Sequence, residues 1–255
     1  RIEGVNYFTH GFRFLDQPEF LAGTAVPDWL SVADRKCRVR PKLVRPVLEN
    51  GDRDEAAIAR GILQHFHDDE WFHSTRAFVL ASAGLTRRFQ QAFPDDDGMR
   101  TGFLGHIVTE MLLDAVLIGR EPELLDEYYR RLEDVDPERV QRVVNRAARN
   151  TTDRLSGVIQ MFREVRFLYD YLEFPLLLGR LNQVLRRVKL QPLSDRALPV
   201  LESGLELVTG SLDELLPPHR FGPQQSDSLL HEHEQADSAR SSAGAERPRR
   251  RERQP

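Results

Sequence analysis

Residues 61–74 read GILQHFHDDEWFHS and carry a high density of side chains that bind metals. On an α-helix, residues four apart share one face and lie about 6 Å apart along the axis. His65, Asp69 and His73 follow this spacing. His65 and His73 would be separated by a rise of about 12 Å, too far for both to bind one ion directly, so we expect two ions that share Asp69.

A second stretch, GFLGHIVTEMLLDAVL at 102–117, repeats the pattern with His106, Glu110 and Asp114. The same face is otherwise apolar, and an unpaired carboxylate buried there would cost on the order of several kcal/mol. Metal ligation would remove that cost. A single His and acid pair four residues apart would more simply be a surface salt bridge. Two sets of such pairs favour a metal site. We expect Asp114 to be an acid that supports the ligands.

Two earlier segments could complete the site. NYFTH offers His10, and GTAVPDW offers Asp28 in what reads as a turn bounded by glycine and proline. Each is a weak signal alone, because His10 could pack or cap and Asp28 resembles a helix N-cap. His67 and Asp68 flank the ligand stripe and are candidate catalytic residues for proton transfer, or supports for the ligands.

Imidazole and carboxylate ligands without thiolates favour Zn, Mn, Fe or Mg. Two ions about 3.5–4 Å apart would lower the pKa of a bridging water and clamp a phosphoryl oxygen. The sequence therefore predicts a metal-dependent phosphate ester hydrolase with two divalent ions, Zn, Mn or Fe, and a bridging hydroxide that attacks phosphorus. The predicted ligands are His10, Asp28, His65, Asp69, His73, His106 and Glu110, and Asp28 is also a catalytic candidate.

A basic segment, DRKCRVRPKLVR, follows Asp28. We expect its Arg35, Arg38 and Arg40 to bind substrate, by steering a phosphate group or an acidic carrier protein toward the ions. The alternative is a solvated loop in a protein that is acidic overall.

These residues together resemble the acyl carrier protein phosphodiesterase family, which is related to the HD-type metal phosphohydrolases. NYFTH, GTAVPDW and GILQHFHDDEWFH stand in the family's order and with its internal spacing. The resemblance implies metal-site roles for His10, Asp28, His65 and Asp69, places His73 where the family has an acid, and implies a phosphopantetheine-type substrate.

The later helix departs from that family, because GHIVTE stands where the family has an Asp-His pair. A His-x-x-x-Asp helix followed by a His-x-x-x-Glu helix is similar instead to the zinc-dependent phospholipase C and nuclease group, although the N-terminal tryptophan ligand of that group is absent here. This second likeness implies a phospholipid-type substrate. Both likenesses cover about residues 5 to 118.

The elements that would position these groups read as helices throughout. Apolar residues recur at three- and four-residue spacings over 54–93, the period of a helix with one buried stripe, and strand-like alternation is absent. We therefore expect an all-α, single multi-helix bundle domain over residues 1–217, with the metal site between helices. Aromatic residues in FREVRFLYDYLEFP are assigned to the core or to the wall of a cleft. Later helices are expected at 98–118, 121–133, 137–150, 154–170, 173–189 and 195–215.

Residues 218–255 are polar, nearly free of aromatic residues and end in an arginine run, which predicts a disordered tail. The histidines of its HEH sequence at 231–233 are expected to be solvated rather than to hold metal.

The composition limits the function classes. Across 255 residues, 36 Lys and Arg oppose 40 Asp and Glu for a net charge of −4, which argues against a nucleic-acid binder. A single cysteine, Cys37, and an N-terminus unlike a signal peptide favour the cytoplasm. Apolar runs are shorter than the roughly 20 residues of a membrane span.

The main alternative to a hydrolase is a non-catalytic or redox di-iron bundle like hemerythrin. A third interpretation is a helical interaction protein with a buried polar network that holds no metal.

Overall fold

The computed structural model describes residues 6–95 and 99–221, and all regular structure within them is helical. The all-α prediction is confirmed. Contacts divide the chain into a unit of Arg1–Pro217 and a unit of Pro218–Pro255, and the second contributes only helix α13 (Pro218–Phe221) to the described residues. The predicted disordered tail and its HEH sequence otherwise lie outside the described residues.

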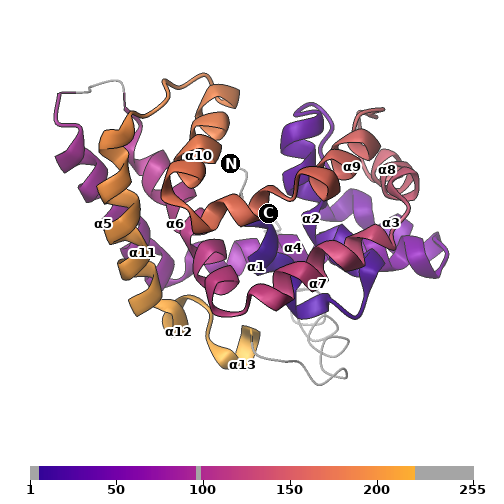
Figure 1. Cartoon of the computed structure of the whole chain (residues 1–255). Helices are drawn as coiled ribbons and strands as arrows, with labels where there is room; N and C mark the ends of the chain where they lie inside the picture. The colour runs from indigo at the N-terminus through magenta and orange to yellow at the C-terminus, as the bar shows by residue number, and fades with distance from the viewer. Residues whose placement is uncertain (1–5, 96–98, 222–255) are drawn as a thin grey trace, which may run out of the picture. The chain divides into compact units, whose positions relative to one another are not determined.

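The helices of the first unit are short to medium in length and are coloured in chain order in Figure 1. They are α1 (Tyr7–Gly11), α2 (Pro18–Ala33), α3 (Pro41–Asn50), α4 (Arg53–Ser74), α5 (Arg76–Ala92), α6 (Thr101–Arg120), α7 (Pro122–Glu133), α8 (Pro137–Arg146), α9 (Leu155–Val165), α10 (Phe174–Arg187), α11 (Leu198–Gly210) and α12 (Leu212–Leu215), with 3-10 helices η1 (Phe12–Phe14), η2 (Phe167–Leu172) and η3 (Asp195–Ala197).

Helices α2 and α4 make the closest backbone approach that bears on the site. A Cβ added to Gly61 would lie 2.1 Å from the Phe20 carbonyl oxygen, and one added to Gly23 would lie 2.3 Å from the Ile58 carbonyl oxygen. Only hydrogen fits in that space, so the two glycines set the distance between the helices. Both belong to the segments, GTAVPDW and GILQH, that carry predicted ligands.

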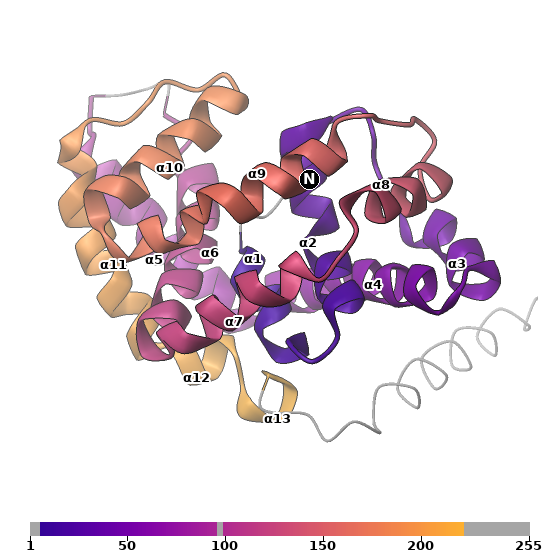
Figure 2. The same ribbon diagram turned by 45° about the vertical axis from the view of Figure 1, so that its right-hand side comes forward.

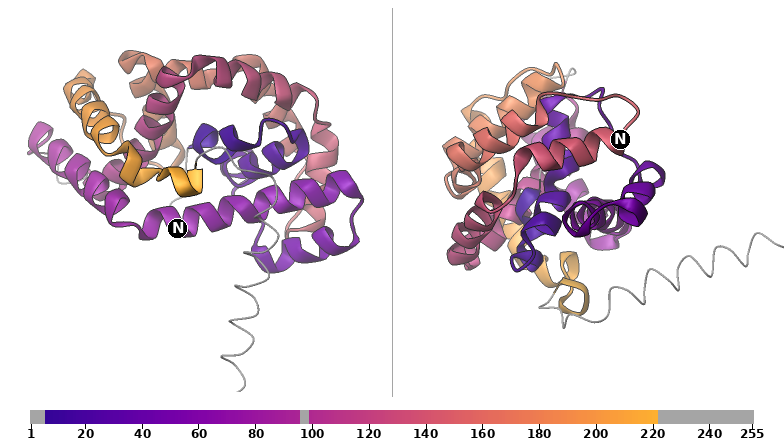
Figure 3. Two further views of the ribbon diagram at one scale, coloured as in Figure 1. Left: turned by 90° about the horizontal axis from the view of Figure 1, so that it is seen from below. Right: turned by 90° about the vertical axis from the view of Figure 1, so that its right-hand side faces the viewer.

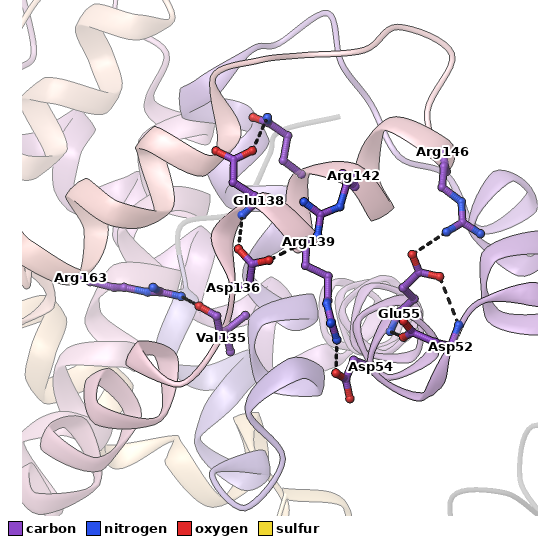
Figure 4. A network of polar contacts seen from close by, with 11 residues as sticks. Asp52, Asp54, Glu55, Val135, Asp136, Glu138, Arg139, Arg142, Arg146 and Arg163 are labelled. Atoms are coloured by element: carbon purple, nitrogen blue, oxygen red, sulfur yellow. Dashed lines mark hydrogen bonds and ion pairs between the residues drawn. The ribbon is translucent and has the colours of Figure 1, made fainter.

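The first turn of α4 is anchored on two sides. Asp52 and Glu55 form a capping box, in which Glu55 N donates to Asp52 Oδ1 at 2.8 Å. Helix α8 adds ion pairs from Arg139 to Asp54 and, at 2.6 Å, from Arg146 to Glu55 (Figure 4). Figure 2 shows α3 and α8 beside this end of α4, so the long helix starts from a fixed position.

Helix α6 lies in the core beside α5 and α11 (Figure 1). Gly105 allows the contact with α5, because a Cβ there would lie 2.4 Å from the Ser82 carbonyl oxygen. By length and mean hydropathy (1.5) α6 could cross a membrane, but 72% of its apolar window is buried inside the protein. A core helix passes the same test, so this feature is weak evidence for a span.

Helix α1 has only five residues, all buried, and therefore depends on its neighbours for stability. It packs against α2, α6 and α7. The view from below in Figure 3 shows this N-terminal segment enclosed, with α4 along one side and α7 along the other.

Several sequence predictions of element boundaries were wrong, including the helix expected at 195–215, which is divided into η3, α11 and α12. GTAVPDW is not a turn, because it lies within α2, which continues through Pro27. Residues 54–93 form two helices, divided at Thr75, whose hydroxyl accepts a hydrogen bond from Phe78 N at 3.2 Å and caps α5. The stretch 154–170 breaks at Arg166, which adopts a left-handed conformation with φ of 47°.

Candidate metal centre

Three side chains from two helices form the first ligand group. His10 of α1 meets His65 and Asp69 of α4, with one ligand atom from each lying within 4.8 Å of the other two. The two imidazole rings are 4.1 Å apart between centroids. His65 Nδ1 lies 2.8 Å from the Thr24 carbonyl oxygen, which fixes the proton on Nδ1 and leaves Nε2 as the ligand atom.

His10 is the clearest indication that something binds here. Its side chain is 3% exposed, and neither ring nitrogen has a hydrogen-bond partner among the described residues. A buried polar group without a partner costs about 1–3 kcal/mol. Ligation of a cation would satisfy one of these nitrogens, so the donor set fits a metal ion.

The second group joins α4 to α6. The Oε1 atom of Glu110 lies 2.8 Å from His73 Nε2 and 3.0 Å from His106 Nε2, and the three residues again place ligand atoms within 4.8 Å of one another. The contact with His106 lacks hydrogen-bond geometry. Phe78 packs on both imidazoles, with centroids 4.7 Å from His73 and 4.9 Å from His106, and so restricts their ring orientations.

Asp69 and His73 connect the two groups. Asp69 belongs to the first group, and its Oδ1 lies 3.2 Å from His73 Nδ1, while the other nitrogen of His73 faces Glu110. A carboxylate on the far nitrogen of a ligating histidine fixes its tautomer and increases its basicity. Asp69 is therefore placed to serve both groups, directly in the first and through His73 in the second.

The protonation states suit cation binding. Burial lowers the pKa of His10 well below its ordinary value and also lowers the pKa of His65, so both rings are neutral near pH 7. Burial alone would raise the pKa of Glu110, but its contacts with His106 and His73 outweigh burial and the pKa is lowered. The first group thus offers two neutral imidazoles, and the second offers an ionised Glu110 carboxylate.

The two groups differ in access. The side chains of His73 and His106 are 22% and 19% exposed, whereas Glu110 is fully buried. His10 and His65 are also buried. Solvent therefore reaches the centre from the His73 and His106 side.

Asp114 supports the centre by holding α1 in place. Its carboxylate accepts hydrogen bonds from Phe8 N at 3.1 Å, from Thr9 N at 2.8 Å and from the Thr9 hydroxyl at 2.6 Å. These are the residues directly before His10. The predicted supporting role of Asp114 therefore takes a specific form, because this carboxylate connects α6 to the segment that carries a ligand.

Asp68 contacts the N-terminal segment from α4, at Arg13, three residues after His10. It forms a buried ion pair with Arg13 at 2.6 Å and accepts a hydrogen bond from Gln64 Nε2 at 2.9 Å. Of the two roles predicted for Asp68, this arrangement fits support rather than proton transfer, because the carboxylate lies between two donors. His67 is exposed and belongs to neither ligand group.

Asp28 is not brought into either group. It lies in the interior of α2 with 1% exposure, so the interpretation as an N-cap in a turn was wrong. Burial raises the pKa of Tyr7 and Tyr128, and the negative charge of Asp28 adds to both shifts. Its ligand and catalytic roles remain predictions.

Arg35, Arg38 and Arg40 line one pocket of about 400 Å³ together with Phe66 of α4. The Arg35 and Arg38 side chains donate to the carbonyl oxygens of Arg187 and Arg35, at 3.0 Å and 3.1 Å. None of the six grouped ligands lines this pocket. The substrate-binding role of these arginines stays a prediction.

Several residues of the centre were missed by sequence reasoning. Thr24 contributes only a backbone carbonyl, for which no side-chain pattern exists. Arg13 and Thr9 act through partners distant in sequence. Only Gln64 had a usable signal, since it stands four residues before Asp68.

Comparison of the chain with family models, curated proteins and solved structures returns no significant match, so the geometry of the two ligand groups carries the functional inference.

Proposed function

We propose that this chain is a metal-dependent phosphoric ester hydrolase that acts on phosphodiesters. The observation that carries the proposal is the convergence of six side chains from α1, α4 and α6 into two adjoining groups, linked by the contact of Asp69 with His73. Two neighbouring sites of mixed imidazole and carboxylate character suit Zn, Mn or Fe.

In this proposal each group holds one divalent cation. His10, His65 and Asp69 hold the buried one, and His73, His106 and Glu110 hold the more accessible one. When bound, such ions lower the pKa of coordinated water and neutralise charge on a phosphoryl oxygen.

The surrounding residues contribute position rather than chemistry. The Thr24 carbonyl oxygen orients His65, Asp69 orients His73, and Phe78 fixes the rings of the second group. Substrate would approach the exposed edges of His73 and His106. A positive pocket formed by Arg35, Arg38 and Arg40 would attract an anionic substrate, which could be of phosphopantetheine or phospholipid type, or an acidic carrier protein.

Hydrolysis of bis(p-nitrophenyl) phosphate by the purified chain tests the proposal. We expect activity that depends on added Zn, Mn or Fe, that a chelator abolishes, and that Asp69→Ala lowers by on the order of 100-fold or more, since even loss of a residue that only orients a ligand costs about 10–100-fold. The matched control is Glu70→Ala, which removes the neighbouring exposed carboxylate on the same helix and should leave the rate unchanged.

A rate that is equal in Asp69→Ala and Glu70→Ala, or one that survives complete removal of metal, would refute the proposal. A folded Asp69→Ala variant, shown by its circular dichroism, is needed for the comparison to count.

The same centre also suits a di-iron protein that binds oxygen or transfers electrons. Four imidazoles and two carboxylates within a helical bundle favour this alternative. An iron-loaded chain with strong near-ultraviolet and visible absorption and no phosphodiesterase activity would establish it in place of the hydrolase.

A further inference from the structure

A second pocket of about 180 Å³ lies among α2, α9, η2 and α10 and contains none of the six ligands. Its wall is aromatic, with Tyr7, Trp29, Phe162 and Phe167 among the lining residues. Phe162 lies at the centre of this cluster, with ring centroids 5.0 Å from Tyr7, 5.5 Å from Trp29 and 5.3 Å from Phe167. Phe162, Phe167 and Tyr171 of the predicted aromatic stretch thus line a pocket, and Phe162 and Tyr171 are also buried in the core.

The rim of the pocket is apolar and open to solvent. Met161 is 47% exposed and Val165 is 50% exposed, although both side chains line the pocket. They stand four residues apart on α9 and therefore extend one apolar face from the pocket to the surface. An apolar ligand longer than the pocket could continue along this face.

Two arginines line the pocket, and they differ in the number of contacts that their guanidinium groups make. Arg180 is fully engaged, because it pairs with Asp170 at 2.6 Å, donates to Gln183 at 3.2 Å and lies over the Phe167 ring. Arg187 is exposed, and its guanidinium has no hydrogen bond or ion pair with any residue that the structure describes. Arg187 is thus a cation beside an apolar pocket with its donors available.

Trp29 supplies a second unsatisfied donor. The side chain is completely buried and lines the pocket, and its indole N–H has no acceptor within the described residues. Buried tryptophan N–H groups normally find a partner. A ligand with an oxygen acceptor would provide one.

We propose that this pocket binds an anionic amphiphile, such as a medium-chain carboxylic acid. The chain lies against the aromatic wall and the Met161–Val165 face, and the carboxylate pairs with Arg187. Charge complementarity at Arg187 selects an anion over a neutral ligand. The proposal does not depend on the metal chemistry, because the pocket and the ligand groups share no residue.

Quenching of Trp29 fluorescence by ω-bromooctanoate tests this binding, because bromine quenches an indole only on close approach. The chain has two tryptophans, so Trp71→Phe leaves Trp29 as the sole reporter. We expect saturable quenching below the concentration at which the probe forms micelles. Arg187→Glu should weaken binding about tenfold or more, which corresponds to about 1.4 kcal/mol.

The matched control is Arg186→Glu, an equal change of charge at the neighbouring exposed residue, which does not line the pocket. It should change the affinity less than twofold. ω-Bromooctanol lacks the anionic head, so it should bind the parent chain about tenfold more weakly than the acid does. It should bind Arg186→Glu and Arg187→Glu with equal affinity.

Three results would overturn the proposal: absence of saturable quenching, equal loss of affinity in Arg186→Glu and Arg187→Glu, and equal affinity for the acid and the alcohol. Sedimentation with anionic vesicles that persists in Arg187→Glu, without quenching by the free acid, would also reject it and would point to a membrane surface instead.

Discussion

The hydrogen bonds of Asp114 join two residues of α1 to the middle of α6, and they determine where His10 lies. Three donors stabilise the carboxylate, but complete burial opposes its charge. Burial prevails and raises the pKa of Asp114 from 3.8 to about 7. The residue that anchors the first ligand thus also makes the stability of the fold depend on pH.

The direction of that dependence follows from proton binding. Between about pH 4 and 7 the folded chain binds a proton at Asp114 that the unfolded chain does not, so the free energy of unfolding falls as pH rises through this range and levels off above it. Asp114→Asn removes this contribution. The difference in unfolding free energy between parent and variant should therefore shrink as pH rises from 4 to 7.

Urea unfolding of both metal-free proteins at several pH values measures this difference. The lowered pKa values of His10 and His65 affect both proteins alike and cancel in the comparison. A difference that stays constant or grows with pH would contradict the assignment to Asp114.

At the residue scale, the four-residue spacing in the sequence identified side chains that belong to the two candidate ligand groups. His65, Asp69 and His73 lie on one helix, and four-residue steps brought each into a group. Sequence could not assign Asp28, because its burial within α2 depends on tertiary packing that single-residue patterns do not encode.

The contact between α2 and α4 links the fold to the site. Gly23 and Gly61 let the backbones approach, and Thr24, next to Gly23, then accepts the hydrogen bond of His65, one turn after Gly61. The glycines of both ligand-bearing segments are thus explained by helix packing. A side chain at either position would move His65 away from its acceptor.

Gly61→Ala should therefore destabilise the fold by about 1–3 kcal/mol, the usual cost of overpacking, and weaken metal binding at the first group. The rigid backbone of α2 meets the new Cβ, so a side-chain rotation cannot relieve the clash. Urea unfolding and metal titration measure the two effects.

Gly157→Ala is the control, because nothing lies within 4 Å of a Cβ added at that helical position of α9. It should raise stability by about 0.4–1 kcal/mol by restricting the unfolded chain. If Gly61→Ala were as stable as Gly157→Ala, close helix packing would not be what positions His65.

At the element scale, periodicity predicted helices α6 and α7 to within a few residues, because each is flanked by proline, glycine or charged residues. It did not predict the break at Thr75 or the left-handed Arg166, since both depend on the angle at which the next helix packs. It also missed that α2 continues through Pro27, where the preference of proline for helix ends is overridden by burial.

For the whole molecule, the all-α class followed from composition and periodicity, whereas the partition of six ligands into two groups required the packing of three helices. His10 is separated by many residues from α4, the helix that completes its group. The anionic-amphiphile pocket was not predicted for the same reason, because α2, α9 and α10 meet only in the folded chain.

The most direct test of the central claim is the metal content of the purified chain, measured by elemental analysis together with protein concentration. Two divalent ions per chain are predicted for the parent and for His67→Ala, an exposed histidine outside both groups, and one ion for His106→Ala. A metal-free parent chain that takes up no Zn, Mn or Fe, or a content that His106→Ala and His67→Ala leave equally unchanged, would contradict the assignment of a two-metal centre.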